Sequence, residues 1–369
     1  MRIFVFSILF LAIAACVDPI TIKNPDVTFQ LAIDGEITDE PGPYTISILR
    51  ASKLNADLDR RVPVSRATVT LSDDAGNSET LKEDPYGIYK TAIGGIHGTV
   101  GRTYTLKIVT VEGKVFESLP ELMKPSAEID SLYYTFESKT TIGPDGQPQT
   151  ADGFAVYMNA NSLTEGENLY RWRFEGTYQI ETFPQYATAK SPSGEIVPAP
   201  LPCSGYEVSP RGVLFQDNVI CDCCICWITQ YEDKPMVSDD QFISNNQFKR
   251  VRVGFVPITP ATFNYKYYHV TVKQMSLSRA VYDFWKIVAS QKTGATSLFQ
   301  PAIGKVRSNI FSKDDDEEVQ GIFSVSAVKE KSIFISNEDI PYQVPELAKI
   351  TTSCKYLDNS TNIKPAYWK

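Results

Sequence analysis

Alternating apolar and polar positions fill the first third of the chain and predict short β-strands. Apolar residues occupy every second position in residues 28–34, 44–48, 67–72 and 104–111, which is the period of a strand with one buried face. Groups rich in Gly, Asp, Asn and Pro separate these segments and predict turns. Short strands at this spacing are typical of an all-β sandwich. We therefore expect a β-sandwich domain over residues 27–118.

The strand patterns become longer after residues 119–125, where two prolines indicate a linker. They lie at residues 130–137, 154–160, 170–181, 251–257, 265–275, 319–328 and 332–336. One helix is predicted from Ser276 to Lys292, because apolar residues recur there at i, i+3 and i+4 and Gly294 can end it. A chain of 369 residues also favours two domains over one core. Residues 126–369 should form the larger, β-rich domain.

The regular pattern fails between residues 183 and 249, an insertion that contains a group of cysteines. The chain has six cysteines besides Cys16: Cys203, Cys221, Cys223, Cys224, Cys226 and Cys354. An even number of cysteines in an exported chain indicates disulfides, and six of them allow fifteen connectivities. We expect one bridge to tie Cys354 to the central group and the cysteines to staple the insertion, because long loops are seldom ordered without such help.

Two other chemistries are open to the cysteines at residues 221–226, which form two overlapping C-x-x-C pairs. Four thiolates are able to bind zinc, and a C-x-x-C pair is able to act as a redox dithiol. Disulfides are favoured because thiols are oxidised outside the cytoplasm, and because no βαβ unit of the thioredoxin kind is visible.

The amino terminus has the pattern of an export signal. Arg2 precedes an apolar run at residues 3–12, and small residues lead to Cys16. This pattern resembles a bacterial lipoprotein signal, which implies removal of residues 1–15, lipidation of Cys16 and a tether over residues 16–26. The run is too short to span a membrane as a helix. An ordinary secretory signal with a coincidental cysteine is the alternative.

The charge of the chain limits the partners that it can recruit by electrostatics. The formal net charge is −8 and no basic block is present, so nothing favours nucleic acid or anionic lipid headgroups. Membrane attachment should then depend on acyl chains at Cys16, since each buried methylene contributes about 0.8 kcal/mol.

No catalytic, cofactor-binding or metal-binding constellation stands out in the sequence. The two histidines, His97 and His269, have no recognisable nucleophile elbow near them. The acidic run at residues 314–318 lacks the alternating ligands and central glycine of a calcium loop and is expected to be a solvated turn. Phosphate-loop and dinucleotide motifs are absent.

The chain ends in an aromatic pair after a proline, Pro365-Ala366-Tyr367-Trp368. An aromatic ring buries about 150 to 250 Å² when it packs. We expect this tail to dock on the body of the protein, close to Cys354. A partner-binding tail is the alternative.

The sequence resembles two known groups of proteins. Residues 63–89 resemble carboxypeptidase-regulatory or prealbumin-like modules, which implies an Ig-like or prealbumin-like first domain. The second resemblance rests on residues 33–37, 42–44, 226–227, 277–282, 298–301, 308–310, 321–324 and 364–368, with Cys16 and Cys354. Through these segments, nearly the whole mature chain resembles the domain-of-unknown-function 4249 lipoproteins of Bacteroidota.

The resemblance to the 4249 family implies a place beside TonB-dependent outer-membrane receptors and no established catalytic residues. We therefore expect a non-enzymatic, lipid-anchored accessory or binding protein of the outer membrane that works with a TonB-dependent transporter. A surface hydrolase acting on polysaccharide or peptide polymers is the alternative, and its paired carboxylates cannot be selected from a sequence alone.

Overall fold

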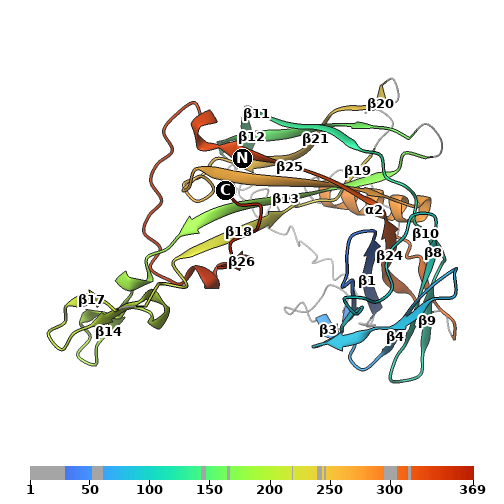
Figure 1. Ribbon diagram of the computed structural model, residues 1–369, viewed down its shortest axis with the longest axis horizontal. Coiled ribbons are helices and arrows are strands. Elements are labelled where there is room, and N and C mark those ends of the chain that lie inside the picture. The colour runs from blue at the N-terminus through green and yellow to red at the C-terminus, as the bar shows by residue number, and fades with distance from the viewer. Residues whose placement is uncertain are drawn as a thin grey trace, which may run out of the picture.

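Two β-sandwiches lie beside each other in the computed structural model, and a narrow excursion projects from the second (Figure 1). The structure describes residues 30–51, 61–142, 147–163, 167–217, 219–238, 243–244, 247–294, 306–314 and 317–369. The predicted signal peptide, lipidated Cys16 and tether lie outside the described residues. The chain is mainly β, with one α-helix among the described residues, as the sequence predicts.

The first sandwich consists of two sheets, which we name A and B. Sheet A has the order β24 (Val319–Ser326), β1 (Gln30–Thr38), β2 (Thr45–Ala51), β7 (Ile88–Lys90) and β6 (Lys82–Asp84), with β3 (Arg61–Pro63) beside β2. Sheet B has the order β23 (Ile310–Ser312), β9 (Val115–Ser118), β8 (Thr103–Val109), β4 (Thr68–Asp73) and β5 (Ser78–Thr80), with β10 (Glu121–Leu122) beside β8. Ile33 and Ile46 of sheet A share one core with Leu71 and Ile108 of sheet B. Alternation along each strand supplies the apolar face that this core requires.

Two strands of the first sandwich come from near the end of the chain, which the predicted boundary at residue 126 did not allow for. β24 pairs with β1 in parallel, from Leu31 opposite Val319 to Thr38 opposite Ser326, and β23 pairs with β9. A single strand pattern does not reveal a partner that is almost three hundred residues away. The first sandwich therefore combines residues 30–122 with residues 310–326, and its Ig-like or prealbumin-like character stays a prediction.

The second sandwich consists of sheets C and D. Sheet C has the order β11 (Ile129–Ile142), β12 (Pro148–Asn161), β21 (Gln247–Pro257) and β20 (Ile243–Ser244). Sheet D has the order β25 (Val328–Ser336), β22 (Tyr267–Ser276), β13 (Tyr170–Glu181), β18 (Ile225–Tyr231) and β26 (Ser360–Thr361), with β19 (Met236–Val237) beside β13. Phe154, Val253 and Phe248 of sheet C pack against Trp172 and Tyr268 of sheet D in one aromatic-rich core.

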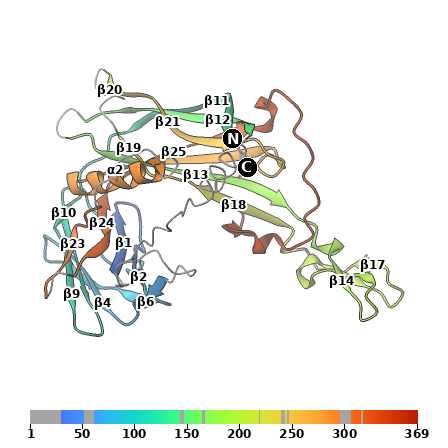
Figure 2. The same cartoon turned by 180° about the vertical axis from the view of Figure 1, so that it is seen from behind.

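The α-helix α2 (Arg279–Gly294) lies at the junction of the two sandwiches (Figure 2). It starts later than predicted because Ser276 still belongs to β22, and Ser278 accepts a hydrogen bond from the backbone N–H of Val281 at 3.3 Å. Its apolar face packs on Leu169, which precedes β13, and on Ile322 of β24, so the helix contacts both sandwiches. Within the described residues, no helix has the length and apolar character that crossing a membrane requires.

The turn between β4 and β5, at residues 74–77, allows a test of backbone conformation alone. Gly76 has a φ of +87°, and an added Cβ would meet nothing within 4 Å. Gly76→Ala should therefore lower the free energy of unfolding by about 1 kcal/mol. The whole loss should come from the backbone, because alanine disfavours the left-handed conformation. Gly94→Ala is the matched control, because its Cβ also meets nothing and its backbone is not left-handed. Urea unfolding of both variants checks this prediction. Equal losses of unfolding free energy in the two variants would contradict it.

Candidate functional site

The excursion between β13 and β18, residues 183–224, is the most unusual feature of the fold, and we name it the finger. It contains two short hairpins that project from the body (Figure 1): β14 (Thr188–Lys190) with β15 (Ile196–Pro198), and β16 (Tyr206–Val208) with β17 (Leu214–Gln216). Short 3₁₀ helices lie at Pro184–Tyr186 and Pro202–Ser204. Each hairpin is a separate two-stranded sheet. Isolated hairpins are marginal in water, so the finger needs another source of order.

Disulfides supply that order at the base of the finger. Cys203 bonds Cys223, Cys221 bonds Cys224, and Cys226 bonds Cys354. Cys226 is the second residue of β18 and Cys354 begins a 3₁₀ helix at Cys354–Tyr356, so the third bridge joins sheet D to the C-terminal segment. These three pairs are one of the fifteen connectivities that the sequence leaves open. The first two bridges join residues of the finger to one another, and the third lies in β18, directly after the finger.

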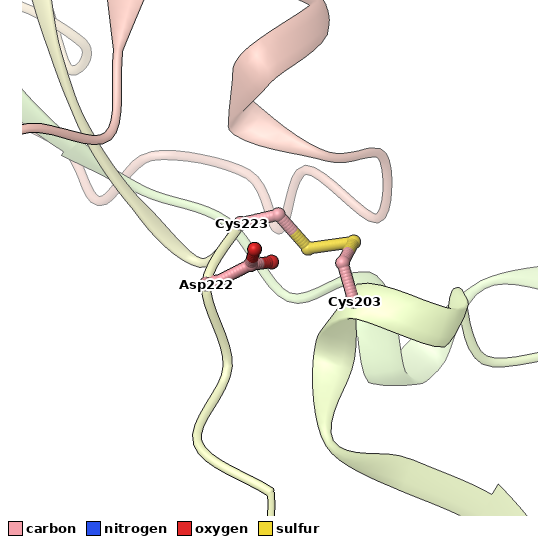
Figure 3. Close-up of side chains that lie close together, drawn as sticks. All are labelled: Cys203, Asp222 and Cys223. Atoms are coloured by element: carbon pink, nitrogen blue, oxygen red, sulfur yellow. A yellow bond between two sulfur atoms is a disulfide. The ribbon is translucent and has the colours of Figure 1, made fainter.

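One group of potential metal ligands lies in this region among the described residues: Cys203, Asp222 and Cys223 (Figure 3). The two sulfurs are bonded to each other, so neither is a thiolate. The Asp222 carboxylate pairs with Lys355 at 2.9 Å. With its cysteines oxidised, the 221–226 segment therefore has neither the four thiolates of a zinc site nor the free dithiol of a redox site.

Apolar side chains on the finger face water. They include Ile220, with 88% of its surface exposed, and Ile196, with 72%. The others are Tyr186, Val197, Val208, Val213, Phe215 and Val219. None of these eight residues belongs to a core cluster, because two hairpins side by side are too thin to enclose one. Exposed apolar groups gathered on one projection are typical of surfaces that bind another molecule.

The C-terminal tail lies against the outer face of sheet D, as the sequence predicts. The Tyr367 ring stacks on His269 with 4.0 Å between centroids, and its hydroxyl donates a hydrogen bond to Thr177 Oγ1 at 3.1 Å. Trp368 packs edge-on against Trp227 and Phe334. We name residues 365–369 the strap. The strap therefore covers His269, Thr177 and Trp227 on the outer face of sheet D.

The two histidines have different surroundings in the described structure. His97 is exposed in a turn, where its carbonyl accepts a hydrogen bond from Tyr104. His269 is buried beneath Tyr367, and this burial lowers its pKa to about 4. The His269 ring is therefore neutral at neutral pH and serves as a packing surface for the strap.

Charged residues that the sequence did not single out join the two sandwiches. Arg173 of β13 pairs with Glu36 of β1 at 3.1 Å, and Lys273 of β22 pairs with Glu40 at 3.0 Å. Burial raises the pKa of Glu36, and the positive charge of Arg173 opposes that rise. Glu36 and Glu40 are therefore engaged with cations across the junction, which favours a structural role over general acid–base catalysis.

The acidic run at residues 314–318 also contacts protein where it is described. The Asp314 carboxylate accepts a hydrogen bond from the backbone N–H of Val115 at 2.7 Å, and Glu317 pairs with Lys114. Asp315 and Asp316 lie outside the described residues. Asp314 and Glu317 thus contact the chain at the start of β9.

These features define a double β-sandwich protein with a disulfide-braced finger and a C-terminal strap. The chain belongs to the family described as domain of unknown function (DUF4249), whose model matches residues 17–332. The match includes the first sandwich, the finger and most of the second sandwich, and it ends within β25, before β26 and the strap. No curated protein matches the chain.

Proposed function

We propose that this protein is a non-enzymatic, lipid-anchored accessory or binding protein of the outer membrane that partners a TonB-dependent transporter in nutrient uptake or complex assembly. The observation that carries the proposal is the finger, where apolar side chains stand in water on a projection braced by disulfides. The lipid anchor at Cys16 rests on the sequence pattern of residues 1–16.

The finger suits a docking role for a physical reason. Burial of an exposed Ile side chain contributes about 1.5 to 3 kcal/mol, and Ile196 and Ile220 are both largely exposed in the free protein. Disulfides at the base reduce the number of conformations of the unbound finger, so less ordering entropy is lost when a partner binds. The proposed partner therefore covers this apolar surface.

A substitution on the finger tests the proposal. Ile220→Asp should reduce recovery of the transporter about tenfold, because loss of about 1.4 kcal/mol of binding free energy is a factor of ten. The measurement is co-purification of the full-length protein from native membranes in mild detergent, with mass spectrometry of the captured receptor and of the mature amino terminus.

Ile93→Asp is the matched control, since Ile93 is 86% exposed but lies on the first sandwich, away from the finger. It should leave recovery of the transporter unchanged. The proposal fails if the wild-type protein captures no TonB-dependent receptor, or if both substitutions reduce capture equally.

A further inference from the structure

Sheet D is interrupted along one edge of β13. β18 pairs with β13 as far as Glu175 opposite Tyr231, and β19 resumes the pairing at Trp172 opposite Met236. The segment between them, residues 232–235, leaves the sheet, and the backbone N–H of Phe174 donates to the Glu232 carboxylate at 3.3 Å. The interruption therefore opens the second sandwich beside the Phe174 ring.

Across this opening lies the edge of sheet C. β21 pairs with β12 on one side and with β20 on the other, but β20 contacts only Gln247 and Phe248. Among the described residues, no strand pairs with the rest of that edge, from Val251 to Pro257. A free strand edge presents backbone N–H and C=O groups that are ready to pair with another chain.

A groove of about 860 Å³ lies between these two edges. Its lining includes Phe174, Val253 and Met236, which belong to the core of the second sandwich or pack against it, and the aromatic rings of Tyr231 and Phe255. The volume is within the usual range for ligand-binding sites, about 300 to 1,000 Å³.

Gly254 brings the backbone of β21 close to this lining. A Cβ at Gly254 would lie 2.3 Å from the Phe174 ring, so only glycine allows the ring to lie directly against the strand. The free backbone edge and the apolar lining thus meet at one place.

We propose that this groove binds an extended polypeptide segment of a partner, which adds as a strand to the free edge of β21. An added strand pairs its main chain with that edge, and its alternate side chains point to opposite faces, so apolar residues at every second position enter between the sheets. The same sandwich edge already accepts a short extended segment of its own chain, because β26 pairs with β18 at Trp227 and Ile228. The groove is separate from the finger and requires neither a lipid anchor nor a transporter.

The charges around the groove favour recognition of the main chain over recognition of a charged ligand. Arg252 pairs with Glu137 at 3.1 Å, and Glu232 pairs with Arg171 at 2.9 Å. Asp233 and Lys234 are adjacent charges of opposite sign. Among the described residues that line the groove, two acidic and two basic side chains balance, so the groove has no net charge to select a strongly anionic or cationic partner.

The test is selection of random dodecapeptides from a display library on the mature protein. The expected result is a set of peptides with apolar residues at every second position. A synthetic copy of a selected peptide should bind the Tyr231→Ala, Phe255→Ala double variant at least tenfold more weakly than it binds the wild type. Tyr86→Ala is the control, since Tyr86 is 75% exposed on the first sandwich, and its binding should match the wild type.

Amide hydrogen exchange on the wild-type protein places the bound peptide without any substitution. Amides within residues 251–257 should exchange at least tenfold more slowly when the peptide is bound. The proposal is overturned if no peptide is selected, if binding survives the double variant, or if exchange slows elsewhere. It is also overturned if neutral hexasaccharides bind with the same dependence on Tyr231 and Phe255.

Discussion

Replacement of Cys226 and Cys354 together by alanine should lower the free energy of unfolding by about 5 kcal/mol. The bridge spans 128 residues of sequence, and in the chain-entropy model a bridge across a loop of this length restricts the unfolded chain by about that amount. Both cysteines are fully buried, so the same substitution also leaves space in the core of the second sandwich. The loss should be visible as a lower urea midpoint.

The bridge between Cys221 and Cys224 is the internal control. It spans only three residues, so its removal by double alanine substitution should cost about 2 kcal/mol in the same model. Trp227 and Trp368 report on the strap by fluorescence, because the two rings pack edge-on. Equal stability losses for the two bridges would show that loop closure is not the source of the stabilisation.

Individual strands could be predicted from sequence because each one carries its own period of two. The pattern at residues 170–181 coincides with β13, and the pattern at residues 265–275 nearly coincides with β22. Burial along β1 alternates as the sequence predicts. Alternation reports only that one face of a strand is covered, and it requires no knowledge of the covering partner.

Strand partners could not be predicted in the same way. The pattern at residues 319–328 reads as one strand, but the chain crosses at Ala327 from β24 in the first sandwich to β25 in the second. Ala327 is a buried apolar residue, 1% exposed, so it gives no turn signal at the crossing. The parallel pairing of β24 with β1 brings together segments that have no neighbouring hairpin signal.

The candidate site was also predictable from the sequence only in part. The sequence indicated disulfides, but the choice of Cys226 as partner of Cys354 depends on the position of β18 in sheet D, beside the C-terminal strand β26. The hairpins of the finger were missed because their strands have three residues each, too few to show a period. The groove beside Phe174 was missed because it arises from an interruption in strand pairing.

Lowering the pH should destabilise the protein through His269. Burial holds the pKa of His269 at about 4 in the folded state, against an ordinary value near 6.5. Between these values the unfolded chain binds a proton that the folded chain does not, so the free energy of unfolding falls as the pH falls. Above about pH 6.5, His269 is neutral in both states and the free energy of unfolding is not reduced by it. By pH 4, proton binding to His269 in the unfolded chain should lower the free energy of unfolding by about 3 kcal/mol.

His269→Phe separates this contribution from that of the buried carboxyls, because it keeps an aromatic ring beneath Tyr367 and removes the titrating group. Burial also raises the pKa of Glu36 and Glu121, and those groups titrate equally in both proteins. The measurement is urea unfolding of both proteins from pH 7.5 to pH 4, and the wild type should lose about 3 kcal/mol more than the variant. His97→Phe, on an exposed turn, leaves the stack of His269 and Tyr367 in place and should keep the wild-type slope. If the wild type and His269→Phe respond to pH in parallel, the strap does not hold His269 in its neutral form.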